Sequence, residues 1–369
     1  MKDSLARRQR RGGILILVLM LLFVMLAIAG LLIDVGMARL TQARMQSVTD
    51  AAAIDGGWQM SLGSDQTSVR EAVANRTDDL FETWGPKRVE FEGGYDLDGD
   101  GILESSQTIR TETLGERIYP SLNQNLNNAS AGDIVLGNYD QTAIPNALPG
   151  LPTGYDRGSS FIADVDDPNS VLVRLRRTDE QNIPGGTSDG NLPYLWSRGS
   201  TLSFGLKGRG IAVRSETIAS LSPATAVGDA TSDLLPSVLN AAIPLTEVLS
   251  ETLSRNSLMS FSGPPQIGAT VIDAPNATVT GTGYLPIAKQ MSSGQWQVIG
   301  FMFANVSVDN IVPATPAESG FSHANITANL ANISALSDEL VEANQSLTGP
   351  YIARAPTLAR SQQINGVSP

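Results

Sequence analysis

One short string carries residue types at the spacing of a cation site. Calcium takes roughly six to eight oxygen ligands, and carboxylates at loop positions 1, 3 and 5 followed by a glycine at position 6 allow a chain to wrap one ion. Alternating aspartates followed by Gly101 meet this requirement, and the carbonyl at position 7 and the carboxylate at position 9 complete the set. The predicted ligands are Asp96, Asp98, Asp100, Ile102 and Glu104.

The string resembles the Asp-x-Asp-x-Asp-Gly loops of EF-hand-like and dockerin-like repeats. It departs from them at position 12, where Gln107 replaces the acidic residue, so Glu104 must contribute directly or the affinity is weak. Without a cation the crowded carboxylates repel one another, and bound calcium would therefore order the turn and stabilise the fold. The other interpretation is a solvated acidic turn between strands.

Other site chemistry lacks its parts in this sequence. The chain has no cysteine, which excludes thiolate metal sites, thiol nucleophiles and disulfides. Its one histidine, His323, has no acidic neighbour at helical spacing, and no Gly-x-Ser-x-Gly string occurs. We therefore expect no enzyme, with a hydrolase built on two converging carboxylates as an alternative.

The charge distribution also limits the partners. The net charge of −12 combines +4 in residues 1–13 with −16 in the rest, and an acidic body is unsuited to nucleic acid. The glycines Gly205, Gly208 and Gly210 form no dinucleotide or phosphate-loop pattern, so no nucleotide is expected. Six basic residues suggest a patch for anionic glycans or, alternatively, a solvated sheet face: Arg174, Arg176, Arg177, Lys207, Arg209 and Arg214.

The N-terminal region predicts a membrane anchor. Residues 14–33 form an uncharged run of 20 residues, which at about 1.5 Å per residue spans a hydrocarbon core of roughly 30 Å. The basic residues 1–13 precede it and Asp34 follows it, so the positive-inside rule leaves the tail in the cytoplasm and the bulk of the chain outside. A cleaved signal peptide, cut after Ala29, is the alternative.

We expect the helix to continue beyond the membrane as a stalk over residues 34–58. This stretch contains no proline, and a set of apolar residues shares one arc of a helix. The arc consists of Val35, Ala38, Met45, Val48 and Ala52. Gly56-Gly57 supplies the expected stop, and the stalk would pack along partner helices or hold the outer domains away from the membrane.

The same segment resembles the N-terminal region of TadE/TadG-like proteins of the Flp (tight adherence) pilus-assembly system. The resemblance lies in the order of a basic tail, an apolar span, Asp34-Val35-Gly36 and a glutamine-containing helix that ends in Asp50-Ala51-Ala52-Ala53. It implies a bacterial inner-membrane protein whose stalk contacts other pilus-assembly or envelope proteins. Prepilin processing is not expected, because Leu17 stands where type IV prepilins carry a glutamate. Longer members of this family often add a von Willebrand A domain, whose metal site has the pattern Asp-x-Ser-x-Ser. The nearest string in this chain, Asp229-Ala230-Thr231-Ser232-Asp233, does not fit that pattern.

The remainder predicts an α+β protein with a β-rich extracytoplasmic region of one or two domains, over residues 59–225 and 226–369. A helix is expected at 64–84, with Ser68 and Glu71 as a capping box and Gly85-Pro86 as its stop. Alternation and β propensity indicate strands at Arg88–Glu92, Thr108–Thr113, Asp133–Tyr139, Ser170–Arg177, Thr201–Leu206 and Ile211–Leu221.

The second region is expected to be mainly β. Strands are predicted at Gly268–Ile272, Ala277–Tyr284 and Gln295–Val308, and a helix at Leu239–Leu253. Asn325–Val341 has helical apolar spacing weakened by its asparagines, and the polar tail from Ala355 is expected to lack regular structure.

These features favour a non-enzymatic, membrane-anchored component or accessory of a pilus-assembly or surface-attachment system. Its partners would be the inner-membrane lipid bilayer and other pilus-assembly or envelope proteins, and its only cofactor structural calcium. The alternatives are an envelope adhesion or glycan-binding protein that shares only the anchor, and a secreted hydrolase.

Overall fold

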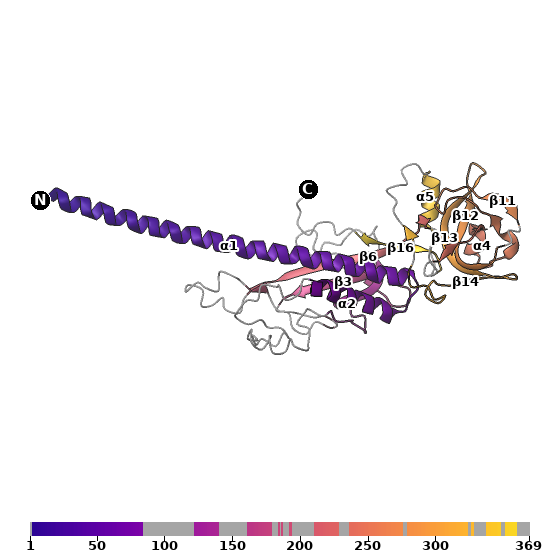
Figure 1. The fold of residues 1–369 in the computed structure, drawn as a ribbon, viewed down its shortest axis with the longest axis horizontal. Coiled ribbons are helices and arrows are strands. Elements are labelled where there is room, and N and C mark those ends of the chain that lie inside the picture. Colours follow the sequence, from indigo (N-terminus) through magenta and orange to yellow (C-terminus); the bar gives the residue numbers. More distant parts are fainter. Residues whose placement is uncertain are drawn as a thin grey trace.

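The protein is α+β, as expected, with one long helix followed by antiparallel sheets (Figure 1). The computed structural model describes residues 2–83, 122–139, 161–178, 184, 186, 192–193, 210–228, 236–275, 279–323, 326–327, 337–347 and 351–359. Two main sheets, one of five strands and one of seven, form the body.

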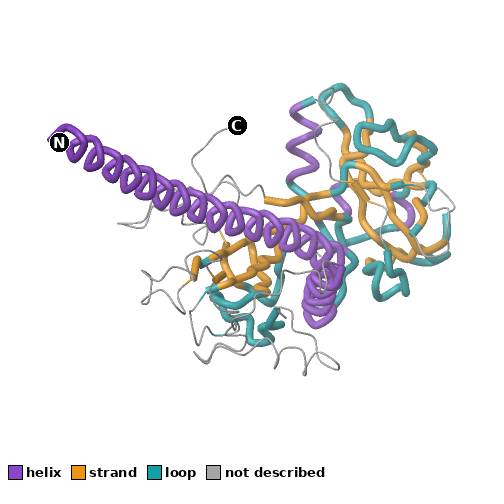
Figure 2. The backbone as a smooth tube through the Cα atoms, turned by 60° about the vertical axis from the view of Figure 1, so that its left-hand side comes forward, coloured by secondary structure: helices purple, strands orange, loops and turns teal. Residues whose placement is uncertain are grey.

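The helix α1 (Lys2–Ser61) dominates the shape of the molecule. Its 60 residues extend for about 90 Å, and only its C-terminal half packs on the body (Figures 1 and 2). The helix ends where Gly63 adopts φ +74 and donates to the Met60 carbonyl, while Ser64 donates to the Gln59 carbonyl. This is the Schellman arrangement, in which a left-handed glycine closes the last turn.

The expected stop at Gly56-Gly57 is therefore wrong. Both glycines lie inside α1, where they permit close packing instead of ending the helix. A Cβ on Gly56 would lie 2.5 Å from Cγ2 of Val73, and one on Gly57 would lie 2.5 Å from Cβ of Pro356. No Cβ contact is normally so short, so both positions require glycine for steric reasons.

The second helix, α2 (Gln66–Thr83), confirms the predicted amphipathic helix but not its cap. Asp65, not Ser68, caps the helix: its carboxylate accepts from the Ser68 backbone N–H at 2.9 Å. Val69 and Val73 are buried in the core that α2 shares with α1. The predicted stop at Gly85-Pro86 lies outside the described residues.

The first sheet has the order β16-β6-β3-β1-β2, and every pair is antiparallel. Its strands are β1 (Ile134–Tyr139), β2 (Phe161–Ala163), β3 (Ser170–Arg177), β6 (Val213–Pro223) and β16 (Arg354–Ala359). The predicted strands at Asp133–Tyr139, Ser170–Arg177 and Ile211–Leu221 are confirmed. Those at Arg88–Glu92, Thr108–Thr113 and Thr201–Leu206 lie outside the described residues.

The helices α1 and α2 cover one face of this sheet. Alternate residues of β3, Val171, Val173 and Leu175, point into a core shared with Met45 and Val48 of α1. The intervening Leu172 belongs to a small cluster with Val135 and Ile218. The period-two pattern of β3 therefore places its two sets of side chains in different environments.

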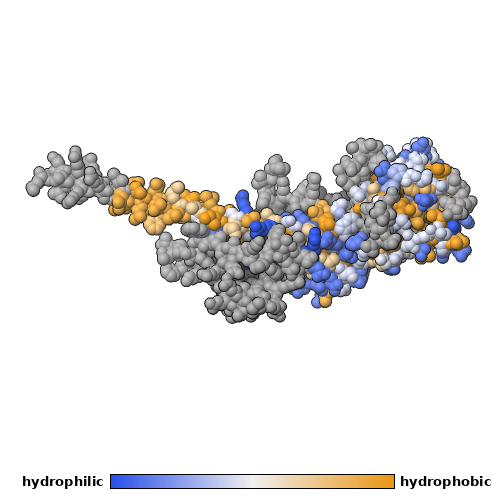
Figure 3. All heavy atoms as spheres, viewed as in Figure 1, coloured by the Kyte–Doolittle hydropathy of each residue, from blue (hydrophilic) through white to orange (hydrophobic). Residues whose placement is uncertain are grey.

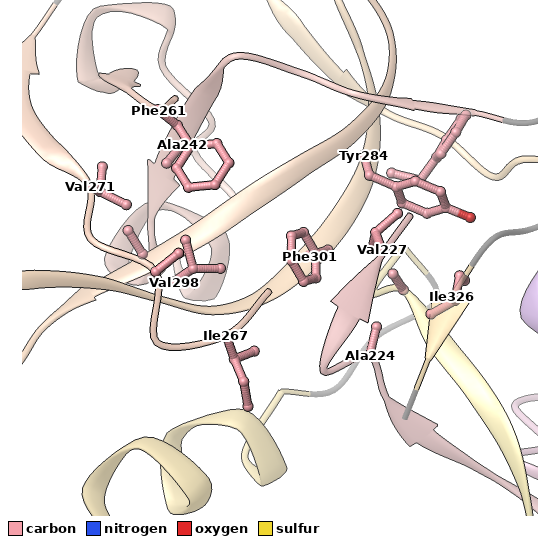
Figure 4. Packing of buried hydrophobic residues seen from close by; sticks show 14 of the residues in the cluster. Ala224, Val227, Ala242, Phe261, Ile267, Val271, Tyr284, Val298, Phe301 and Ile326 are labelled. Atoms are coloured by element: carbon pink, nitrogen blue, oxygen red, sulfur yellow. The ribbon is translucent and has the colours of Figure 1, made fainter. Parts of the chain in front are cut away.

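The second sheet has the order β11-β10-β9-β12-β13-β14, with β8 also paired to β12. Its strands are β8 (Ser237–Val238), β9 (Ala241–Pro244), β10 (Met259–Ser260), β11 (Ile272–Pro275), β12 (Gly281–Gln290), β13 (Trp296–Val306) and β14 (Ile311–Pro313). Residues 268–271 bond to the start of β13 and lead into β11, so the sheet curls back on itself. The hairpin β12–β13 is buried on both faces, with Tyr284 and Phe301 on the side drawn in Figure 4.

Four short strands and three short helices complete the described elements. The strands are β4 (Leu192–Pro193), paired with β5 (Gly210–Ile211), and β7 (Ala226–Val227), paired with β15 (Ile326–Thr327). The helices are α4 (Leu245–Leu249), the 3-10 helix Arg255–Ser257 and α5 (Asp338–Gln345).

Several predictions for the second half are wrong in their bounds or type. The expected helix Leu239–Leu253 contains strand β9, because its apolar residues pair with β10 and β12, and only α4 is helical. In place of Gly268–Ile272, strand β11 begins at Ile272, and β12 lies mostly beyond the predicted Ala277–Tyr284. The prediction for Gln295–Val308 is confirmed by β13. The ambiguous segment Asn325–Val341 contains β15 and the start of α5.

The C-terminal segment is also more ordered than predicted. Instead of an irregular tail, residues 354–359 form β16 and pair with β6 throughout. Just before it, Tyr351 and Ala353 exchange backbone hydrogen bonds with Phe303 and Phe301 of β13. One continuous segment therefore joins the two sheets, although the sequence placed it entirely in the second region.

Candidate membrane anchor and its docking site

The N-terminal half of α1 exposes an apolar surface. Large apolar residues from Leu15 to Ile33 are 41 to 72% exposed, and Figure 3 shows them as a continuous hydrophobic stretch beyond the body. Within the described residues, this is the one helix long and apolar enough to cross a membrane, a test that signal sequences near an N-terminus also meet. Lipid would cover the apolar area that water otherwise contacts.

The C-terminal half of α1 docks on the first sheet through a polar contact. The Gln46 amide donates to Asp50 Oδ1 at 2.8 Å and to Thr217 Oγ1 of β6 at 2.7 Å. Thr217 Oγ1 lies 3.0 Å from Thr49 Oγ1 and 2.5 Å from Asp50 Oδ1. Thr49 and Thr217 are buried, so these groups satisfy one another inside the interface.

Apolar packing surrounds this contact. Met45, Val48 and Ala52, and the neighbouring Ala53, are at most 4% exposed, which confirms the predicted arc as a packing surface from Met45 onward. It packs on the protein's own sheet and not as a separate stalk, and Val35 at its start remains 41% exposed. The small side chains of Ala52 and Ala53, followed by Gly56-Gly57, bring the helix close to the strands beneath it.

The comparison with protein families matches this one element. Residues 12–59 match the family model described as putative Flp pilus-assembly TadE/G-like. The match begins just before the apolar span and ends two residues before the end of α1. Comparisons with curated proteins and with solved structures give no match.

The TadE/G-like segment therefore contains both halves of α1. Its apolar half meets the length and composition requirements of a membrane span, and Asp50, Ala52 and Ala53 are among the residues that hold α1 against the first sheet. The strands that receive the helix lie outside the matched residues. The family pattern thus describes one side of an interface whose other side is supplied by a different part of this chain.

The predicted calcium ligands lie outside the described residues. The loop from Asp96 to Glu104 falls between residues 83 and 122, and among the described residues no group of three acidic or histidine side chains is placed to hold a metal ion. The single histidine, His323, is exposed.

Most of the six basic residues suggested as a glycan-binding patch make contacts within the chain. Arg174 Nε pairs with Glu216 at 2.9 Å, and Arg176 Nη1 pairs with buried Asp133 at 3.1 Å. Both guanidinium groups also donate to backbone carbonyls of residues 130–132. Burial lowers the pKa of Arg176, and the Asp133 carboxylate opposes that shift. Arg177 and Arg214 also have interactions within the chain, and Lys207 and Arg209 lie outside the described residues.

Arg70 is a buried cation that the sequence did not lead us to expect. It is 1% exposed and donates to the carbonyls of Gln124 and Ile134 and to Oδ1 of Asn128. The Asn128 amide in turn donates to the Leu136 carbonyl, so this side chain is committed to the fold. The sequence feature that indicates its burial is the position of this arginine between Val69 and Val73, on the apolar face of α2.

Proposed function

We propose that the protein is a non-enzymatic, membrane-anchored component or accessory of a TadE/TadG-like pilus-assembly or surface-attachment system. The observation that carries the proposal is the division of α1. The TadE/G-like segment exposes an apolar half of membrane-spanning length and uses its other half to hold a two-sheet body. This arrangement suits a protein that presents a rigid outer body at a fixed distance from the membrane.

The proposed location is the bacterial inner membrane, with one pass and a cytoplasmic N-terminus. The basic tail before the span supports this orientation. Retention of the anchor is supported by the continuity of α1, which passes through Ala29 without interruption and reaches the docked residues beyond Met45. The bulk of the chain would then lie outside the cytoplasm.

We also propose structural calcium binding by Asp96, Asp98, Asp100, Glu104 and the carbonyl of Ile102. The support is the ligand spacing in the sequence. The role would be to order a connection of the outer body and not to take part in a reaction.

Affinity purification of the tagged full-length protein from membranes, after crosslinking in intact cells, tests the proposed function. Recovery of pilus-assembly or secretion proteins is the expected result. Bound polysaccharide without such proteins would favour the adhesion alternative. Hydrolytic turnover that one carboxylate substitution abolishes would favour the hydrolase alternative. A matched sample with residues 1–33 deleted measures what is recovered without the anchor.

A further inference from the structure

The face of α1 that points away from the body carries an uncharged stripe that begins at the last residue of the predicted membrane span and continues beyond it. Ile33, Gly36, Leu40, Ala43 and Ser47 recur at alternating steps of three and four residues, and all are exposed. Leu40 is 44% exposed, and a Cβ added to Gly36 would meet nothing within 4 Å. These are the a and d positions of a heptad repeat, the pattern by which one helix packs along another.

The stripe continues into the membrane span without a break. The same spacing runs back through Ala29, Leu26 and Leu22, all exposed, while the body packs on a different face of the helix, through Met45, Val48 and Ala52. An occupant that follows the whole stripe lies along α1 both in the lipid and beyond it. Such an occupant is itself a membrane-spanning helix, parallel or antiparallel to α1.

Two arginines flank the stripe, and their positive charge favours some binding partners over others. Arg39 precedes Leu40 at position g, and Arg44 follows Ala43 at position e; both are exposed. In a parallel pair, position g of one helix lies beside the following position e of the other, and these positions determine partner choice. Two copies of this chain, which share one orientation in the membrane, would place Arg39 beside Arg44 twice.

We propose that the stripe binds the membrane-spanning helix of a different protein, one that carries Asp or Glu next to its own apolar seam just outside the bilayer. A carboxylate there would pair with Arg39, which supplies the selectivity, because Arg44 also interacts within its own chain. This inference rests on the proposed function, since it takes the apolar half of α1 to be retained in the membrane, and it identifies the partner-binding face of that helix.

The absence of cysteine makes a direct test possible, because a single introduced cysteine is the one thiol in the chain. Leu40→Cys lies on the stripe, and Val35→Cys lies off it at nearly equal exposure, 41% against 44%. Each full-length variant, in native membranes, is labelled with a benzophenone maleimide and irradiated. An unchanged melting temperature in detergent shows that the variants fold.

The expected result is a covalent adduct from Leu40→Cys that is several-fold weaker from Val35→Cys. Its crosslinked peptide should come from the membrane-proximal helix of another protein with an acidic residue beside the apolar seam. Adding Arg39→Glu should reduce the adduct several-fold, and adding Arg39→Lys should preserve most of it. A photoadduct between two copies of Leu40→Cys, adducts with lipid alone, or equal adducts at both positions would each overturn the proposal. An adduct with a membrane helix unrelated to pilus assembly would support the stripe and contradict the proposed function, whereas pilus proteins recovered without an adduct would do the reverse.

Discussion

The Thr217 hydroxyl on β6 donates a hydrogen bond of 2.5 Å to the Asp50 carboxylate on α1. The Gln46 amide donates to the same carboxylate, so Asp50 is the acceptor that holds two donors of the helix–sheet interface together. Replacing Asp50 by alanine leaves these donors without their charged partner. We expect Asp50→Ala to lower the free energy of unfolding by about 1 to 3 kcal/mol.

Denaturant titration of the full-length protein in detergent, followed by tryptophan fluorescence, measures this loss. Thr217→Val should cost a comparable amount, and the double variant should cost less than the sum because both changes break one contact. Ser47→Ala, on the exposed face of the same helix, is the control and should stay within about 0.5 kcal/mol. Strict additivity of Asp50→Ala and Thr217→Val would contradict a shared contact.

The close approach of α1 to its neighbours predicts an unusual cost for a glycine-to-alanine change in a helix. Alanine normally improves an exposed helix by about 1 kcal/mol relative to glycine. At Gly56, however, the added methyl would lie 2.5 Å from Val73 Cγ2 and 3.3 Å from Val171 Cγ1. Gly56→Ala should therefore destabilise the protein by about 1 to 3 kcal/mol in the same titration.

Gly36→Ala is the matched control in the same helix, because nothing lies within 4 Å of its added Cβ. It should leave the purified protein equally or more stable. Combining Gly56→Ala with Val73→Ala should cost less than the sum of the two single changes, because the smaller side chain at position 73 makes room for the methyl. If Gly56→Ala stabilises the protein as much as Gly36→Ala does, the interface is looser than the structure indicates.

The sequence predicted α1 and its docking arc because both depend on local periodicity. An apolar run of membrane-spanning length and an arc that contains Met45 and Val48 are readable without any knowledge of their partners. The function of Gly56-Gly57 was not readable in this way. A glycine pair is a good helix stop by itself, and only its neighbours in space, Val73 of α2, Val171 of β3 and Pro356 of β16, show that it serves close packing.

The errors in the second half have a related cause. Leu239–Leu253 has a helical apolar pattern. Ala241 to Ile243 nevertheless form part of strand β9, which pairs with β10 and β12. The polar sequence from Arg354 onward has little strand signal, but β6 supplies a complete partner edge for it. In both segments, pairing between distant strands overrides local preference. The acidic residues from Asp96 to Glu104 have the spacing of calcium ligands, which is also a local pattern. The calcium site remains a prediction from the sequence.

Two ion pairs of similar length predict very different contributions to stability. Arg176–Asp133 is 3.1 Å long with side chains 9% and 1% exposed, whereas Arg76–Asp55 is 3.2 Å long with side chains 43% and 41% exposed. Asp133→Asn leaves a buried cation without its counter-charge and should cost about 3 to 5 kcal/mol. Asp55→Asn should cost at most about 1 kcal/mol because solvent screens the exposed pair. Equal costs in denaturant titration would show that burial does not distinguish them.

If the anchor is retained, the mature protein begins before Gly30. Because α1 is continuous from the span into the docked half, we expect the purified protein to contain residues N-terminal to Gly30 and to resist extraction from membranes by alkaline carbonate. Intact-mass spectrometry identifies the first residue. A mature chain that starts at Gly30, together with release by carbonate, would establish the cleaved signal peptide instead.

The last prediction concerns calcium and the spacing of Asp96, Asp98 and Asp100. Carboxylates this close in sequence repel one another, and a cation that binds the folded protein more tightly than the unfolded chain raises stability by mass action. The melting temperature of the full-length protein should therefore rise in millimolar calcium relative to chelator, and the rise should vanish in an Asp98→Ala, Asp100→Ala double variant.

Magnesium at the same concentration controls for ionic strength, and it should act more weakly because it favours a smaller octahedral site. Because Gln107 stands at position 12, Glu104 carries more of the binding than it would in a complete loop, so Glu104→Gln should reduce the calcium-dependent rise while Gln107→Glu should increase it. If the melting temperature in calcium equals that in chelator for the unmodified protein, the string is only an acidic turn.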